Sequence, residues 1–340
     1  MIPVIYDPAE KNHSPDNFVV RGVRQQNKEV PERTELMLSA LDQAGFSVAL
    51  PEPFGMAPLK AVHTDRYLEF LETGHSQWSA LENAAPEIIP NAFPVNPHAG
   101  YPGSIVGRAG FHMGDMACPI NAGTWAAARG AANSALTATK LVRQGARAAY
   151  ALCRPPGHHA FADRAAGFCF LNNAAVAAQY ARDQGTERVA ILDVDVHHGN
   201  GTQDIFYDRS DVFFASLHGD PAEFYPFFWG YEDQTGEGAG EGFTANYPLP
   251  LGSGEIVFME ALGHALERIA SFDPGLLILS LGIDISINDP YAALEVTADG
   301  FSAIGTAVEA AGLPTAILQE GGYVAPDLGT NMVRVISAFA

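Results

Sequence analysis

Residues 191–199 combine an apolar run with acidic and imidazole side chains at alternating positions. The run reads Ile-Leu-Asp-Val-Asp-Val-His-His-Gly, so Asp193, Asp195 and His197 are spaced two residues apart. Alternate residues of a strand point to the same face, so these three side chains begin on one side of the chain. Burying them unpaired would be costly, and metal ligation offsets that cost, because carboxylates and imidazoles are ordinary zinc ligands. This segment alone leaves a hydrogen-bonded polar strand end open as the alternative.

Two histidines follow a proline-stiffened turn in the segment Arg154-Pro-Pro-Gly-His-His159. A turn can direct both His158 and His159 into one cavity, whereas neighbours on a regular strand or helix point apart. Histidine is the side chain suited to proton transfer near neutral pH. A lone buried histidine is more often structural, but the adjacent pair beside a metal-type strand predicts catalysis.

Two further segments end apolar runs with groups that suit the same chemistry. Ser280-Leu-Gly-Ile-Asp284 places a single carboxylate after one run, and Glu320-Gly-Gly-Tyr323 follows another. The glycines of the second segment allow close backbone approach. A tyrosine there can donate its phenolic proton to a developing oxyanion, although composition alone favours an ordinary half-buried tyrosine.

Short apolar runs alternate with helical stretches along the chain. The strand-like runs are 148–153, 188–195, 212–217, 276–281 and 315–319, preceded by a first strand at the N-terminus. The helical stretches are 124–145, with Thr124 as its expected N-cap, 172–185, 254–271, 297–312 and 327–340. This alternation predicts one α/β domain over residues 1–340, with a central, mostly parallel sheet flanked by helices on both faces. Ligands gather outside the carboxyl ends of such strands, so the polar segments are expected to converge on one cleft.

The segment 86–121 breaks this pattern, because it is rich in Pro, Gly and Asn and shows no clear period. A loop of this length inside a compact domain is usually functional or disordered. We expect an ordered insertion that shapes the mouth of the cleft or a subunit interface.

The composition narrows the class of protein. The 340 residues include 19 Lys+Arg and 39 Asp+Glu, which gives a formal charge of −20. This charge argues against nucleic-acid binding and would attract small cations, although acidity for solubility alone is the more ordinary explanation. Three cysteines without framework spacing indicate a reducing compartment. Because there is neither a signal peptide nor an apolar run of ~18 residues, we expect a cytoplasmic protein that does not enter membranes.

Five ordered segments of the chain resemble zinc-dependent deacetylases of the arginase–deacetylase superfamily. More narrowly, they resemble the acetylpolyamine amidohydrolases and histone-deacetylase-like amidohydrolases. The segments are Arg154–His159, Asp193–Thr202, Ser216–His218, Ser280–Asp284 and Glu320–Tyr323. The resemblance implies the arginase–deacetylase fold and removal of an acetyl (acyl) group from an N-acetylated amine, above all acetylputrescine or acetylcadaverine. Deacetylation of acetyl-lysine in proteins or peptides is the alternative.

The same resemblance implies one catalytic zinc ion, whose expected ligands are Asp195, His197 and Asp284. His159 would act as general base, with His158 as electrostatic partner or acid, and Tyr323 would stabilise the tetrahedral oxyanion. The chemistry agrees, because zinc polarises a carbonyl and brings its bound water to a pKa near 7. A histidine pair can then move the proton.

Supporting residues also follow from the resemblance. A structural potassium ion is expected at Asp193, Asp195, His197, Ser216 and Leu217. The carboxylate of Asp193 would orient His158, and Asn200 would stand behind His159. The expected walls and lining of the acyl channel are Phe168, Tyr225, Gly167 and Gly322.

The chain departs from parts of the superfamily at informative positions. Arginase-like relatives bind a second metal through aspartates where this chain has Gly199 and Ser286, so a second catalytic metal lacks its ligands. Many protein deacetylases carry aspartate at the place of Asn200. Asparagine there resembles the polyamine branch and should make His159 a weaker cation.

The insertion 86–121 also resembles the polyamine branch, where a similar insertion narrows the channel by dimerisation, so a homodimer is expected. That branch uses glutamates of this loop to bind the distal ammonium, but the corresponding positions here carry Val106 and Ala117. Asp115 lies close by and is the candidate for amine recognition. A non-catalytic metal-dependent binding protein is the competing class, and the intact matched residues argue against it.

Overall fold

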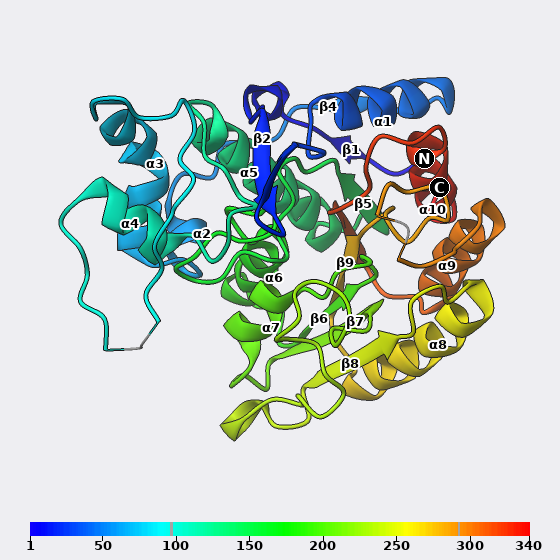
Figure 1. Cartoon of the computed structure of the whole chain (residues 1–340). Helices are drawn as coiled ribbons and strands as arrows, with labels where there is room; N and C mark the ends of the chain where they lie inside the picture. Colours follow the sequence, from blue (N-terminus) through cyan, green and yellow to red (C-terminus); the bar gives the residue numbers. More distant parts are fainter. Residues whose placement is uncertain (96–97, 292) are drawn as a thin grey trace.

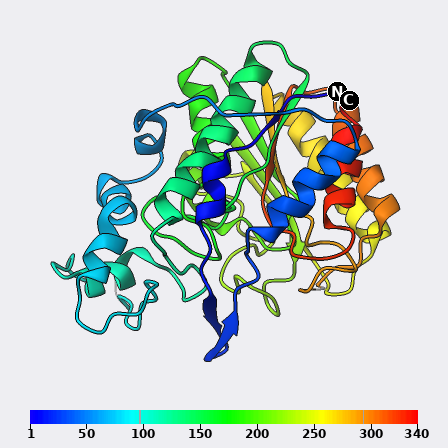
Figure 2. The ribbon, with the colours of Figure 1, turned by 90° about the horizontal axis from the view of Figure 1, so that it is seen from above.

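The computed structural model describes residues 1–95, 98–291 and 293–340. Eight parallel strands form one sheet in the order β4-β1-β5-β10-β9-β6-β7-β8 (Figure 1). Their bounds are β1 Val4–Ile5, β4 Val48–Ala49, β5 Ala148–Ala151, β6 Val189–Asp193, β7 Val212–Gly219, β8 Thr244–Leu249, β9 Leu276–Leu281 and β10 Thr315–Gln319. A separate antiparallel hairpin, β2 Asn17–Val20 and β3 Val23–Gln26, projects from the body (Figure 2).

Helices cover both faces of this sheet. They are α1 Glu32–Gln43, α2 Ala57–Lys60, α3 Asp65–Ser79, α4 Ile105–His112, α5 Thr124–Arg143, α6 Asn173–Asp183, α7 Asn200–Phe206, α8 Glu255–Phe272, α9 Ala298–Ala310 and α10 Leu328–Ser337, with 3-10 turns at Pro8–Asn12 and Gly238–Gly240. One apolar core joins the sheet to α1, α8, α9 and α10, and a second joins its other face to α5 and α6 (Figure 2). The predicted single α/β domain is therefore confirmed.

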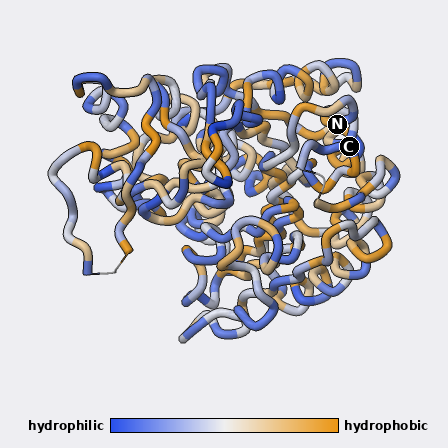
Figure 3. The backbone as a smooth tube through the Cα atoms, in the orientation of Figure 1, coloured by the Kyte–Doolittle hydropathy of each residue, from blue (hydrophilic) through white to orange (hydrophobic). Residues whose placement is uncertain are grey.

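The central strands are buried along their whole length, which explains their continuous apolar sequences. Every residue of β5, β6, β9 and β10 is buried. A parallel strand covered by helices on both faces needs such a run rather than an alternating one. The outer helices alternate between hydrophobic and hydrophilic colour (Figure 3), as expected where only one face of a helix meets the core.

Several predicted bounds differ from the observed ones; the strand predicted over 148–153, for example, ends at Ala151. Two further differences have a clear local cause. The strand that was expected to run to Asp195 ends at Asp193, because the Asp195 amide donates to Asp193 Oδ1 (3.1 Å) instead of continuing the ladder. Thr124 is not the N-cap of α5, because Gly123 holds that position. The Thr124 hydroxyl instead accepts from the Asn121 amide (2.9 Å) and closes the turn before the helix.

The insertion 86–121 packs against α3 and α5 at the side of the domain and contains α4 (Figure 1). Residues 96 and 97 of this segment lie outside the described part. Ile88 and Ile120 form an isolated bridge that brings its two ends together, and Ile105 and Ala109 of α4 join a third apolar cluster with α3. The described residues of the insertion are thus anchored to the body. Nowhere in the described ranges does a helix have the length and apolar character that crossing a membrane requires.

Candidate active site

The polar segments meet at the carboxyl ends of four neighbouring central strands. β5, β10, β9 and β6 lie side by side in that order. The residues that follow them are His158 and His159 after β5, Tyr323 after β10, Asp284 after β9, and Asp195 and His197 after β6. The predicted convergence of these segments follows from this strand order.

Asp195, His197 and Asp284 form a compact group of metal-type ligands. Their ligand atoms all lie within 4.8 Å of one another. His197 Nδ1 is 3.2 Å from Asp195 Oδ1 and 3.4 Å from Asp284 Oδ2. All three side chains are buried, and within the described ranges Asp284 Oδ2 has no hydrogen-bond partner. Two facing buried carboxylates with an unpaired oxygen need a cation, so the group fits a divalent metal such as zinc.

The electrostatics of the group support the same conclusion. Burial and the charge of Asp195 raise the pKa of the Asp284 carboxyl. Burial alone would lower the pKa of His197, but the neighbouring carboxylates of Asp195 and Asp284 raise it to about 9. The three side chains therefore create a position that favours positive charge.

Two glycines leave the space in which these ligands come together. A Cβ on Gly321 would lie 2.1 Å from Asp284 Oδ2 and 2.5 Å from Asp195 Oδ2, and one on Gly282 would lie 2.4 Å from Asp195 Oδ2. The Gly321 amide also donates to Asp195 Oδ2 (2.7 Å). A side chain at either position would displace the ligand oxygens, so the glycines are part of the site.

The two adjacent histidines have different electrostatic environments. His158 Nδ1 is 3.0 Å from Asp193 Oδ2, and His159 Nδ1 is 2.6 Å from Asn200 Oδ1. Burial lowers the pKa of His158, but the charges of Asp193 and Asp195 outweigh burial and raise it to about 10. Burial, together with His158 and His197, holds the pKa of His159 well below its ordinary value. The pair thus combines one cationic and one neutral imidazole.

A cavity of about 400 Å³ opens beside this cluster. His159, His197 and Tyr323 line it, and its other walls are largely aromatic: Phe18, Phe168, Phe224, Tyr225, Phe227 and Tyr291. Phe168 holds φ at +68°, an unusual conformation for an aromatic residue. This geometry places an apolar, aromatic channel directly against the polar cluster.

Three of the four predicted channel residues line the cavity, namely Gly167, Phe168 and Tyr225. Gly322 is not among its lining residues. Its carbonyl accepts from the Arg33 guanidinium, and a Cβ there would lie 2.7 Å from Ile283 Cβ, so this residue faces the core.

Asp115 was the candidate for amine recognition, but its carboxylate is already paired. Asp115 Oδ2 accepts from the Tyr225 hydroxyl (2.6 Å) and from the Gly167 amide (3.0 Å), and Oδ1 accepts from the Ala117 amide (2.8 Å). Asp115 is not among the lining residues of the cavity, whereas Ala117 is. The Asp115 carboxylate therefore braces the channel wall. Val106, the other position of the insertion named above, lies on α4 with 43% of its surface exposed.

The residues expected to hold potassium lie together where β6 and β7 end. Asp193 is paired in register with Ser216, and Leu217 follows on β7. Ser216 Oγ is 2.9 Å from His218 Nδ1, and Asp193 Oδ1 accepts from the Asp195 amide. All of these side chains are buried.

Sequence reasoning missed several residues around the site. Phe18, Phe224 and Tyr291 line the cavity from segments without a chemical motif. The Arg33 guanidinium lies 5.0 Å from the centre of the Tyr323 ring and donates to the Glu320 carbonyl (2.7 Å). Arg33 is 287 residues from Glu320, so no local spacing could have revealed this contact.

Comparison with known proteins decides the family. The model of the histone deacetylase domain matches residues 27–339. The chain belongs to the histone deacetylase family. It is 46% identical over 335 residues to an acetylpolyamine amidohydrolase of Burkholderia pseudomallei, covering 98% of this chain and 97% of that protein. It is 43% identical over 339 residues to acetylpolyamine amidohydrolase 1 of Pseudomonas aeruginosa, covering 98% of each.

The crystal structure of the acetylpolyamine aminohydrolase from Burkholderia pseudomallei superimposes with a TM-score of 0.96 at 44% identity. The match covers 100% of the chain described above and 98% of the solved chain. The predicted family and fold are thereby confirmed.

Proposed function

We propose that the protein is a zinc-dependent amidohydrolase that removes the acetyl group from an N-acetylated amine. The substrate class is an acetylpolyamine such as acetylputrescine or acetylcadaverine. The observation that carries the proposal is the meeting of a buried Asp–His–Asp group with His159 and Tyr323 at one cavity with aromatic walls. The names of the relatives described above support the substrate class.

Asp195, His197 and Asp284 would hold the metal. When bound there, zinc would supply a polarised amide carbonyl and a water of lowered pKa. The unpaired Oδ2 of Asp284 and the two glycines that clear space for the carboxylates support this assignment.

His159 is proposed as the general base. Asn200 Oδ1 can only accept, so His159 Nδ1 carries its proton and Nε2 remains basic. His159 takes a proton from water as the water oxygen bonds to the carbonyl carbon. The C–N bond then breaks, and the amine leaves with a proton that the histidine pair donates to its nitrogen.

His158 and Tyr323 would stabilise the charges that develop. His158, held beside Asp193, stays cationic near the reacting atoms and serves as electrostatic partner or acid. Tyr323 would donate its phenolic proton to the oxyanion of the tetrahedral intermediate. Burial foremost raises the pKa of Tyr323 well above its ordinary value, so the phenol keeps the proton it must donate.

The finer assignments are part of the same proposal. A potassium ion would stabilise the strand ends at Asp193, Ser216 and Leu217, together with the main chain of the metal-binding bend. The channel walls Phe168 and Tyr225 would flank the acetyl group and the methylene chain. The enzyme would act in the cytoplasm as a homodimer, with the insertion 86–121 at the channel mouth.

Acetate release from purified, zinc-loaded protein tests the proposal. We expect turnover of acetylputrescine and acetylcadaverine, and slower turnover of an acetyl-lysine peptide, because a mouth capped in the proposed homodimer would admit only slender amines. A faster rate on the peptide would favour the protein deacetylase alternative. Failure on all three substrates would refute the acetyl assignment.

The Tyr323→Phe variant tests the oxyanion role separately. It should bind a metal-chelating inhibitor as the native protein does and lose about 10²–10³-fold in kcat. Full turnover by this variant would exclude the phenol from the reaction.

A further inference from the structure

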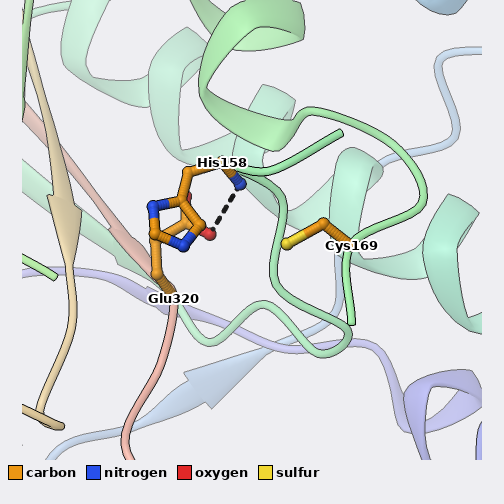
Figure 4. A group of neighbouring side chains, drawn as sticks. All are labelled: His158, Cys169 and Glu320. Atoms are coloured by element: carbon orange, nitrogen blue, oxygen red, sulfur yellow. Dashed lines mark hydrogen bonds between the residues drawn. The ribbon is translucent and has the colours of Figure 1, made fainter. Parts of the chain in front are cut away.

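A second group of metal-type side chains lies beside the proposed catalytic pair. Ligand atoms of His158, Cys169 and Glu320 lie within 4.8 Å of one another, and all three residues are buried (Figure 4). Their polar atoms are already engaged. Glu320 Oε2 accepts from the amides of Gly157 (2.6 Å) and His158 (3.1 Å), and Cys169 Sγ donates to the Gly167 carbonyl (3.4 Å). The group is therefore a hydrogen-bonded cluster rather than an open metal site.

The Glu320 carboxylate connects three of the segments that build the site. Oε2 bonds the turn that carries the two histidines, and Oε1 accepts from the Ser280 hydroxyl (3.1 Å) at the end of β9. Glu320 itself begins the loop that leads to Tyr323. Its side chain is fully buried, so no water competes for these bonds. Main-chain N–H groups buried at this depth need a partner, and a carboxylate gives them a strong one.

We propose that Glu320 is a positioning residue for the deacetylation reaction. The expected effect on activity rests on the proposed function. Its carboxylate fixes the backbone at Gly157 and His158 against the loop of Tyr323. The imidazoles on one side and the phenol on the other then face the same cavity. Glu320 does not line that cavity, so it acts through the backbone and not on the substrate.

A second connection between the same two loops should keep Glu320 variants folded. Arg33 Nη1 and Arg154 Nε are each 2.8 Å from Glu29 Oε1. Arg33 also donates to the Glu320 main-chain carbonyl, and Arg154 begins the histidine turn. These contacts do not involve the Glu320 side chain. Its removal should therefore loosen the turn without unfolding the loops.

Two substitutions separate the hydrogen-bond acceptor from the charge. Glu320→Ala removes the acceptor, and we expect kcat to fall about 10²-fold, because small misplacements of catalytic groups cost this much. We expect KM to stay within about threefold, since the aromatic walls of the cavity, Phe168 and Tyr225 among them, keep their own contacts. Glu320→Gln keeps an oxygen for the two amides and should retain kcat within about fivefold, because a neutral acceptor is only moderately weaker. Glu255→Ala is the matched control, because Glu255 accepts from the Thr297 amide (3.3 Å) at the start of α9, away from the cavity.

Amide hydrogen exchange gives a readout that does not depend on turnover. In metal-loaded protein, the segment 154–160 should exchange faster in Glu320→Ala than in the native protein, Glu320→Gln or the Glu255→Ala control. Unchanged exchange, or native kcat in Glu320→Ala, would overturn the inference. A Glu320→Gln variant as slow as Glu320→Ala would overturn the acceptor role in favour of the charge. If the native protein released no acetate, the proposed function would fail, and the exchange measurement would still decide whether Glu320 holds the turn.

Discussion

The strand ends and the channel mouth of this protein are built in opposite ways. At the strand ends, Asp195 and Asp284 are completely buried, and backbone amides bond three of their four oxygens. At the mouth, Phe227 lines the cavity and is 47% exposed, and the next residue of the same loop, Phe228, is 79% exposed. The proposed reaction therefore depends on buried side chains that the core holds in place. Substrate access depends on exposed side chains of a loop.

This difference has an energetic basis. A buried carboxylate that loses a partner leaves a donor unsatisfied, which costs about 1–3 kcal/mol and more for charged groups. An exposed aromatic side chain that is removed leaves only solvent behind. The effects of substitutions on activity and stability should therefore decrease from the strand ends to the channel mouth.

The largest effect should come from Asp284→Asn, which removes one charge from the proposed metal site. Loss of the metal removes several kcal/mol of transition-state stabilisation, so kcat/KM should fall at least about 10³-fold. Elemental analysis of the purified variant should show little bound zinc. Asp299→Asn is the control, because that side chain is 98% exposed and should keep native activity and metal content. Native zinc content in Asp284→Asn would contradict the proposed ligand set.

Gly321→Ala should have the next largest effect, because the added Cβ would lie 2.1 Å from Asp284 Oδ2. The carboxylates must move apart, and we expect about 10- to 10²-fold weaker zinc binding, comparable to the loss of a group that orients a metal ligand. Competition with a zinc chelator measures the affinity. Gly263→Ala in α8 has open space around its Cβ and should bind zinc normally. Equal affinity of the two variants would show that the close packing at Gly321 is not needed.

The strand-end site could be predicted largely from the sequence, whereas its supports could not. Asp195 and His197 stand two residues apart after one strand, and the strand rule sends Asp284 to the same edge. Those signals are local. The pairing of Arg33 with Glu320 spans 287 residues, and that of Asp115 with Tyr225 spans 110 residues. No spacing rule reveals that these partners meet.

The same reason explains why the N-cap predicted at Thr124 is wrong and why the contacts of Asp115 could not be foreseen. Thr124 has the composition of an N-cap, but its hydroxyl accepts from Asn121 and the helix begins at Gly123. Asp115 has the charge expected of an amine site, yet Tyr225, Gly167 and Ala117 occupy its oxygens. Residue type alone indicates what a group can do, and the tertiary partners determine what it does.

Asp115→Ala tests the channel wall, which lies between the strand ends and the channel mouth. Its effect on activity should be intermediate. The change frees the Tyr225 hydroxyl and the Gly167 amide, so the channel wall should loosen. We expect KM for acetylputrescine to rise about tenfold, with a smaller change in kcat, because the lost contact orients the wall and not the reacting atoms.

A double-mutant cycle with Tyr225→Phe isolates this contact. If the hydrogen bond from the Tyr225 hydroxyl causes the rise in KM, Asp115→Ala should raise KM less in the Tyr225→Phe background than in the native protein. Additive effects would assign the loss to the Gly167 amide instead.

The smallest effect should come from Phe228→Ala at the mouth. Because 79% of this residue is exposed, its removal should change the free energy of unfolding by no more than about 0.5 kcal/mol. Phe168→Ala is the comparison, since Phe168 is 7% exposed and its ring lies 5.4 Å from that of Phe18. Phe168→Ala should lower the free energy of unfolding by about 3 kcal/mol or more. Urea unfolding of both variants measures the difference. A loss above about 1 kcal/mol in Phe228→Ala would mean that the mouth also stabilises the fold. The contrast between the two regions would then be wrong.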